Sequence, residues 1–231
     1  MFFWGKKDKD TLKLTQRKKQ SLKLIAREGI TFDKSLPCLF EDSKVQLKSI
    51  DDISKMALMS GIIAQLGFIA KANVDSASAN KARATVIEKI KIFGIEDCIG
   101  AKEKRIIEGN CSEQDIIDAN WYFESAWALC WCLGLVDDIK NGGVVCEASK
   151  VIAMANRCRN LEEFKSECCL RSKEDILNMH DLYYRYYWAV DKNWNDKVFK
   201  TGSLNSSIVI ERRKALEWVL SDVKFFDELK L

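Results

Sequence analysis

Residues 170–190 contain the side chains best suited to chemistry in this chain of 231 residues. The segment holds four tyrosines, one tryptophan and the single histidine of the protein, His180, with Asp181 and Arg185 close behind it. We expect a helix this rich in aromatic residues to be buried, and an unpaired polar group is costly inside a core. His180, Asp181 and Arg185 must therefore have either partners or a function.

A second set of charged side chains falls within other apolar segments. Glu124 interrupts the run WYFESAWALCWCLGL and lies one helical turn from aromatic or apolar residues on either side. We expect Glu124 to be buried and to pair with an arginine, with Arg185 and Arg212 as the candidates. Asp181 and Arg185, four positions apart, can also pair on their own helix. Glu211 adds a further acid next to Arg212.

These charged residues allow two interpretations. In the first they form one site, where the carboxylates act as acid or base or hold a metal and the arginines bind an anionic ligand. In the second they form a buried ion-pair network that fixes the register of the helices. The sequence favours the second, and a hydrogen-bonded core histidine over a general base. The candidate residues are Glu124, His180, Asp181, Arg185, Glu211 and Arg212.

No catalytic or cofactor-binding signature accompanies these residues. A Ser-His-Asp or Cys-His site would have to be built on His180, and neither a GxSxG turn nor a catalytic-cysteine motif occurs. No glycine-rich loop opens a helix in the manner of a phosphate-binding loop, and one histidine is too few for a histidine-based metal site. We therefore expect no cofactor and no metal, and the enzyme class is not favoured.

The pattern of helix signals predicts an all-α protein. Pro37 is the single proline, and alternating β-branched runs are few, so we expect a single irregular domain of about eight or nine helices with little or no sheet. Expected helix starts are Ser49 or Asp51, Ser112, Asn160, Ser172 and Ser206 or Ser207, and expected stops are Gly29, Gly94 and Gly109. Residues 141–143 predict a turn with positive φ, residues 144–146 a short extended piece, and residues 193–205 a polar loop.

The N-terminal region is strongly basic. Its first 23 positions hold eight basic residues against two acidic ones, a local charge of +6, and begin with Phe2, Phe3 and Trp4. We expect a basic arm over residues 1–20 that can be removed without loss of fold, and a single helical domain over residues 21–231. The arm is interpreted first as a solvated helix start, and alternatively as a contact for anionic lipid or nucleic acid.

Cysteine usage indicates the compartment. Nine cysteines at irregular spacings, without paired CxxC motifs, are typical of reduced thiols used as small apolar packing groups. The first residues lack a signal-peptide pattern, and no uninterrupted apolar run reaches eighteen residues. The expected protein is cytoplasmic and not an integral membrane protein.

Five segments carry a resemblance to a known family. They run in order through nearly the whole chain: LIAREGI followed by Leu36 and Pro37, DDISKMALMSGIIAQLG, WYFESAWALCWCLGL, LRSKEDILNMHDLYYRYYWA and IVIERRKALEWVL. Together they resemble the bacterial family called domain of unknown function 4272. The resemblance implies a mostly helical cytosolic domain and supplies no activity. Relatives often carry a histidine where Tyr187 stands and a tryptophan where Phe226 precedes Asp227, so a catalytic role for that histidine would not extend to this chain.

These observations favour a non-catalytic cytosolic bacterial protein that acts by binding another protein, as an accessory or immunity-type partner. One alternative is an enzyme or a binder of a small anionic ligand, built on the carboxylate and arginine residues between helices. A second alternative is peripheral contact with a membrane or nucleic acid through the basic arm, with nucleic acid the less expected partner.

Overall fold

The computed structural model describes residues 9–72, 76–196 and 200–231, and in these residues the fold is all-α, without a strand. The helices are α1 (Lys9–Arg27), α2 (Ile50–Lys71), α3 (Ser76–Phe93), α4 (Ala101–Glu108), α5 (Glu113–Cys132), α6 (Ala148–Asn156), α7 (Leu161–Ser166), α8 (Lys173–Asp196) and α9 (Ser206–Val219), with short 3-10 turns at Glu96–Cys98 and Phe226–Glu228. The predicted fold class is confirmed.

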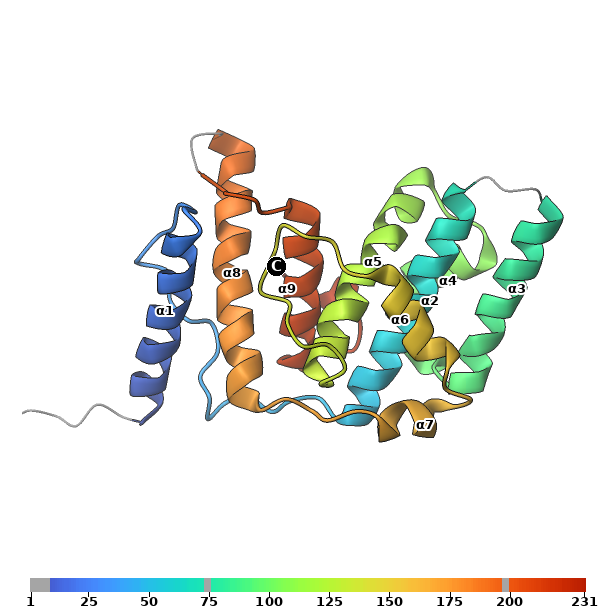
Figure 1. The fold of residues 1–231 in the computed structure, drawn as a ribbon, viewed down its shortest axis with the longest axis horizontal. Coiled ribbons are helices and arrows are strands. Elements are labelled where there is room, and N and C mark those ends of the chain that lie inside the picture. The colour runs from blue at the N-terminus through green and yellow to red at the C-terminus, as the bar shows by residue number, and fades with distance from the viewer. Residues whose placement is uncertain (1–8, 73–75, 197–199) are drawn as a thin grey trace, which may run out of the picture.

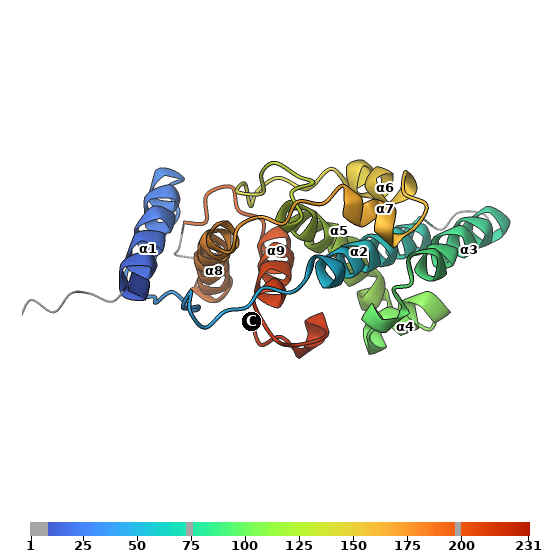
Figure 2. The same ribbon diagram turned by 90° about the horizontal axis from the view of Figure 1, so that it is seen from below.

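Most of the helices stand side by side in a row. From one end to the other the order is α1, α8, α9, α5, α2 and α3, and each helix packs against the next (Figure 1). Helices α6 and α7 cover one side of the α2 and α5 pair, and α4 covers the other side (Figure 2). The row therefore has two open ends, formed by α1 and α3, and its interior lies around α5 and α2.

Helices α2 and α5 form the centre because both are apolar on more than one face. Among the described residues, α2 is the one helix long and apolar enough to cross a membrane. Within the fold, however, 72% of its most apolar stretch is buried. The neighbouring helices therefore cover the surface that gives α2 its high hydropathy, as expected for the central helix of a bundle.

Two glycines let neighbouring elements approach α2 closely. A Cβ atom added at Gly67 would lie 2.7 Å from the Cβ of Ala119 on α5 and 3.2 Å from the backbone nitrogen of Asn120. A Cβ at Gly61 would meet only the Cγ1 of Val151 on α6, at 3.2 Å. Gly67 is thus constrained by backbone, whereas Gly61 faces a side-chain methyl that can shift.

Gly67→Ala is therefore expected to lower the free energy of unfolding by about 1 to 2 kcal/mol more than Gly61→Ala does. Both substitutions gain the same helix propensity of about 1 kcal/mol, so the comparison isolates the contact with α5. Urea unfolding of the two variants measures this difference. Equal urea midpoints for the two variants would show that moving α2 away from α5 costs no unfolding free energy.

The local helix signals are mostly confirmed. Ser49 and Ser112 each accept a hydrogen bond from the N3 backbone nitrogen within a reciprocal capping box, and Asn160 caps α7 in a similar way. One expectation is wrong: helix α8 continues to Asp196, although a polar loop was expected from residue 193. Helix α9 begins at Ser206, one of the two expected starts, and the side chain of Asn205 caps it. Residues 144–146 form no strand.

The turn at residues 141–143 exists, but neither of its glycines has positive φ. A different constraint acts at Gly143. A Cβ atom there would lie 2.1 Å from the carbonyl oxygen of Ser203, which belongs to the segment leading into α9. Glycine is needed at this position for the close approach of two backbones, not for an unusual dihedral angle.

The expected boundary at residue 20 falls inside α1, which begins at Lys9. Arg17 is buried within this helix, donates to Asp42 at 2.7 Å and also bonds the carbonyl oxygen of Phe40 and the side chain of Asn178. Residues 9–20 are thus part of the helical domain. The sequence does not predict this packing, because the charge of a buried arginine does not distinguish it from the exposed basic residues around it. Phe2, Phe3 and Trp4 lie outside the described residues.

Candidate functional site

Glu124 and Arg212 form a buried ion pair between α5 and α9. The side chains of both are about 3% exposed, and the Nε and Nη2 atoms of Arg212 each lie 2.8 Å from Oε2 of Glu124. This is the pairing of Glu124 with Arg212 that the sequence offered as one of two choices. Apolar and aromatic residues of α5 make Glu124 inaccessible, and the stripe of α9 that faces the core carries Arg212 to it.

Other polar atoms of Glu124 and Arg212 form hydrogen bonds with the backbone of the loop between α5 and α6. Arg212 Nη1 donates to the carbonyl oxygens of Ile139 and Asn141 at 3.0 and 2.9 Å, and Nη2 donates to that of Val144 at 2.9 Å. Glu124 Oε1 accepts from the backbone nitrogen of Cys146 at 2.7 Å. The ion pair thus fixes residues 137–147, which we call the 137–147 segment, across α9 (Figure 1).

Asp181 and Arg185 form a separate buried pair on α8. Arg185 Nε and Nη2 lie 3.0 and 2.9 Å from the two carboxylate oxygens of Asp181, and both side chains are almost completely buried. Arg185 also donates to the carbonyl oxygens of Leu36 and Pro37 at 3.4 Å. The expected pairing along the helix is confirmed, and Arg185 holds the connector between α1 and α2.

His180 lies in the core beside Glu217 of α9. Its Nε2 atom is 3.3 Å from Oε2 of Glu217, which also accepts from Arg213 at 3.2 Å. The edge of the Phe40 ring packs against the imidazole at 4.9 Å between centroids. The ring of Tyr187 lies 4.2 Å from the guanidinium of Arg213. The arrangement is that of a hydrogen-bonded core histidine.

The environment of Glu217 gives a pH prediction. Burial alone would raise the pKa of Glu217, but the hydrogen bonds from His180 and Arg213 outweigh it and hold the pKa below its ordinary value of 4.5. A carboxylate with a lowered pKa stabilises the fold above that ordinary value and loses this contribution as the pH falls through the folded-state pKa. Between about pH 5 and 3, wild type should therefore lose more unfolding free energy than Glu217→Gln. Parallel curves would contradict the assignment.

Glu211 belongs to a fourth group. It accepts from Ser125 Oγ at 2.6 Å and pairs with Lys214 at 2.5 Å. No hydrogen bond or ion pair among the described residues joins the four groups to one another. The six candidates thus belong to separate groups and do not share one hydrogen-bonded network. The interpretation as buried ion pairs between and along helices describes their geometry.

The candidate side chains have little capacity left for a ligand. Within the described ranges, Ser60 Oγ is the one buried side-chain nitrogen or oxygen that lacks a hydrogen-bond partner. The guanidinium groups of Arg185 and Arg212 donate to protein acceptors, and the carboxylates of Glu124 and Asp181 accept from protein donors. Any ligand of these groups would have to displace structural contacts.

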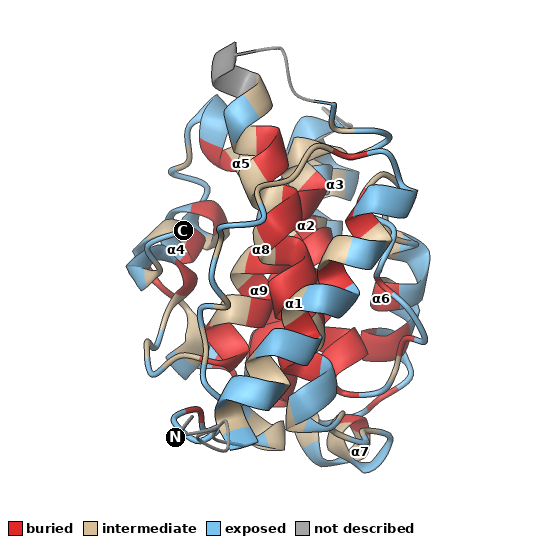
Figure 3. Ribbon diagram, turned by 90° about the vertical axis from the view of Figure 1, so that its left-hand side faces the viewer, coloured by how far each residue is buried: buried red, intermediate tan, exposed pale blue. Residues whose placement is uncertain are grey.

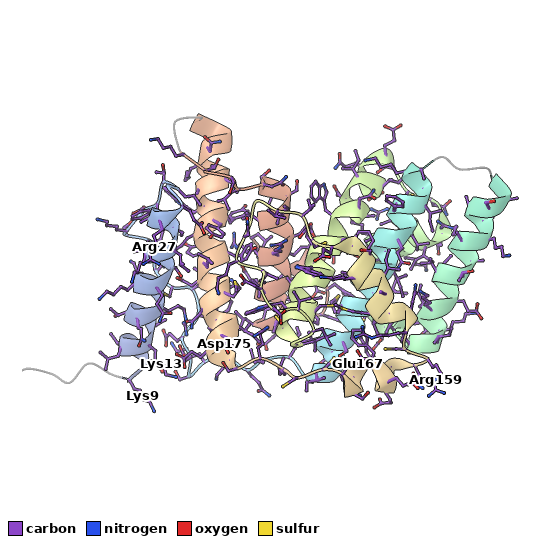
Figure 4. The ribbon with its side chains drawn as sticks, in the orientation of Figure 1. Lys9, Lys13, Arg27, Arg159, Glu167 and Asp175 are labelled. Atoms are coloured by element: carbon purple, nitrogen blue, oxygen red, sulfur yellow. The ribbon has the colours of Figure 1, made fainter. Side chains whose placement is uncertain are left out.

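Two recesses flank the 137–147 segment, and sequence reasoning missed both. The polar recess, of about 270 Å³, lies between the segment, α1 and α8 and includes Gln20, Trp131, Asp137, Asp138, Asp175 and Asn178. Asp175 lies near the end of α8 that this recess reaches (Figure 4). The valine recess, of about 210 Å³, includes Trp127, Val144, Val145, Cys146, Glu147 and Arg212. The sequence predicts an extended piece at Val144 and Val145, but it does not predict that these valines line a recess.

The cysteines are free thiols in the structure, as expected. Burial raises the pKa of Cys38 to about 11 and that of Cys98 and Cys130 to about 12, so these thiols are protonated near neutral pH. In the part of the chain that the structure describes, no three histidine, cysteine or acidic side chains lie close enough together to hold a metal ion.

Fold and site together define a single-domain, all-α protein with buried ion pairs both between its helices and along one of them. Residues 17–229 match the family described as a domain of unknown function (DUF4272), and the chain belongs to this family. That description names no activity. No curated protein and no solved structure matches the chain.

Proposed function

We propose that the protein acts by binding another protein through the 137–147 segment. The observation that carries this proposal is the exposure of two adjacent valines on a segment held in one conformation: Val144 is 58% and Val145 60% exposed. The buried Glu124 and Arg212 hold the backbone on both sides of them. A loop that is already ordered loses little conformational entropy when it binds, which favours affinity.

The surroundings of the valines suggest the chemistry of the partner. Asp137, Asp138, Glu147 and Asp175 are exposed around the two recesses. Two exposed lysines pair with acids of this set: Lys140 lies 3.7 Å from Asp138, and Lys150 lies 2.6 Å from Glu147. Asp137 and Asp175 form no ion pair with a lysine or arginine among the described residues. A partner with an apolar side chain for the valine recess and basic side chains for the carboxylates would be complementary in shape and charge.

A small anionic ligand has less support. The arginines that would bind it, Arg185 and Arg212, are buried and already donate to protein oxygen atoms. The polar recess is instead bordered by three aspartates, against Lys140 and Arg171. Arg171, which also lines it, donates to the carbonyl oxygens of Trp131 and Val136 at 2.8 Å. The charge balance of the open surface therefore favours a cationic partner.

Site-specific photo-crosslinking tests the proposal. A photoreactive amino acid is placed at position 145, and in a control chain at Ile92, which is 46% exposed on α3 at the far end of the row. In extract of the native host, position 145 should give a discrete protein adduct that position 92 does not give. Excess unlabelled wild type should compete for it.

The competing chain supplies the sharper comparison. Val144→Ser/Val145→Ser should compete at least tenfold less well than wild type, because burying two valines contributes about 1.5 to 3 kcal/mol each. Its melting temperature should be unchanged, since both side chains are exposed. Equal adducts at positions 92 and 145, or equal competition by both chains, would contradict the proposal.

A further inference from the structure

The outward face of α1 is a basic stripe. Lys9, Lys19, Lys23 and Arg27 are exposed, and a helical rotation of 100° per residue places them within an arc of about 80°. The buried residues of the helix, Arg17, Ser21 and Ile25, lie on the opposite side. We call these four exposed cations the α1 stripe. Figure 3 shows α1 from this side, with its exposed turns facing outward.

The charges of the α1 stripe are uncompensated within the described residues. No carboxylate there forms an ion pair with any of the four. Lys13 differs from these four cations, because it lies nearer the buried side of α1 and forms an ion pair with Asp42 at 3.3 Å. Asp10, the one acid within α1, is about 100° away from Lys9 around the helix axis. The stripe therefore presents positive charge to whatever lies beyond the end of the row.

We propose that the α1 stripe docks the protein on an anionic lipid surface. The stripe runs for 18 residues along a straight helix, about 27 Å at 1.5 Å per residue, and suits contact with a flat array of headgroups. Helix α1 is the outermost helix of the row, and no other helix among the described residues lies beyond it (Figures 1 and 4). Helix α1 would lie on the surface without entering it, because its buried side packs on α8.

One exposed apolar side chain within the stripe, and three aromatic residues that precede α1 in the sequence, favour lipid over nucleic acid. Leu12 is 54% exposed and falls within the arc of the stripe. Phe2, Phe3 and Trp4 precede the helix in the sequence, and such aromatic residues are enriched at membrane interfaces. Three of the four cations are lysines, whereas arginine is the residue of choice for the recognition of nucleic acids. The combination suits a headgroup layer beside a shallow apolar zone.

Cosedimentation of the full chain with vesicles tests this inference. The probes are phosphatidylcholine vesicles with and without about 30% phosphatidylserine. Each basic residue near such a surface contributes about fivefold in affinity. Lys19→Glu/Lys23→Glu should therefore weaken binding to the anionic vesicles by about a hundredfold or more. The control Lys81→Glu/Lys91→Glu makes the same change of charge on α3, at the other end of the row, and should bind within about threefold of wild type.

The outcomes separate the possible occupants. Binding of wild type should require phosphatidylserine and weaken as salt rises, while circular dichroism shows both variants folded. Equal loss in the two variants would show a nonspecific effect of net charge and overturn the assignment to α1. Stripe-dependent binding to DNA or RNA oligonucleotides without vesicle binding would overturn the lipid assignment. The proposed partner site at Val144 and Val145 is intact in both variants, so its test is independent of this one.

Discussion

Glu124→Ala is expected to lower the free energy of unfolding by about 3 kcal/mol. The variant leaves Arg212 charged, buried and without a counterion, and it removes the acceptor of the Cys146 backbone nitrogen. Urea unfolding measures the change. An unchanged midpoint would show that the pair contributes nothing to stability.

Two comparisons sharpen this prediction. Arg159→Ala breaks the exposed pair of Arg159 and Glu163 and should leave the urea midpoint close to that of wild type, because water screens an exposed ion pair. The double variant Glu124→Ala/Arg212→Met removes both charges, so it should recover part of the loss. It should not recover all of it, because the carbonyl oxygens of Ile139 and Val144 lose their donor. Complete recovery would mean that the 137–147 segment does not depend on the pair.

Arg17→Met is expected to cost about 3 kcal/mol. It leaves the carboxylate of Asp42, whose side chain is 6% exposed, with only the longer contact to Lys13. It also removes the donor to the Phe40 carbonyl oxygen. Thermal and urea unfolding of the variant test whether α1 is anchored through this arginine.

Lys13→Met is the matched control, since it removes the other cation from the same carboxylate. Lys13 is 39% exposed, so its loss should cost less than about 1 kcal/mol. A chain that starts at residue 21 should behave like Arg17→Met or worse, contrary to the expectation from charge alone that residues 1–20 are dispensable. If that truncated chain melts at the wild-type temperature, the packing of α1 is not needed for the fold.

The parts of the fold that depend on nearby residues could be predicted from the sequence. Capping at Ser112 involves a residue three positions away, and the apolar pattern around Glu124 shows its burial directly. The partner of Glu124 could be narrowed to two arginines. Choosing between them requires knowing that α9 packs beside α5, whereas Arg185 of α8 turns toward the connector at Leu36.

Features that depend on distant backbone could not be predicted. The sequence predicts an ion pair for Arg212. Most of its hydrogen bonds, however, go to carbonyl oxygens of a loop about seventy residues earlier in the chain. Gly143 looks like a turn residue, and its real constraint is a carbonyl at Ser203. The burial of Arg17 could not be predicted, because the density of positive charge in α1 does not show which of its cations is buried.

The arrangement of the helices in a row also sets how the molecule opens. The inner helices α5 and α2 have helical neighbours on several sides, whereas α1 packs mainly on α8 and buries one apolar side chain, Ile25. Amide hydrogen exchange should therefore be slowest in α2 and α5 and much faster in α1, which can detach while the centre stays folded. Detachment would uncover the α8 surface around Asn178. The end of the molecule that carries the α1 stripe is then also the part that unfolds locally at the lowest free energy.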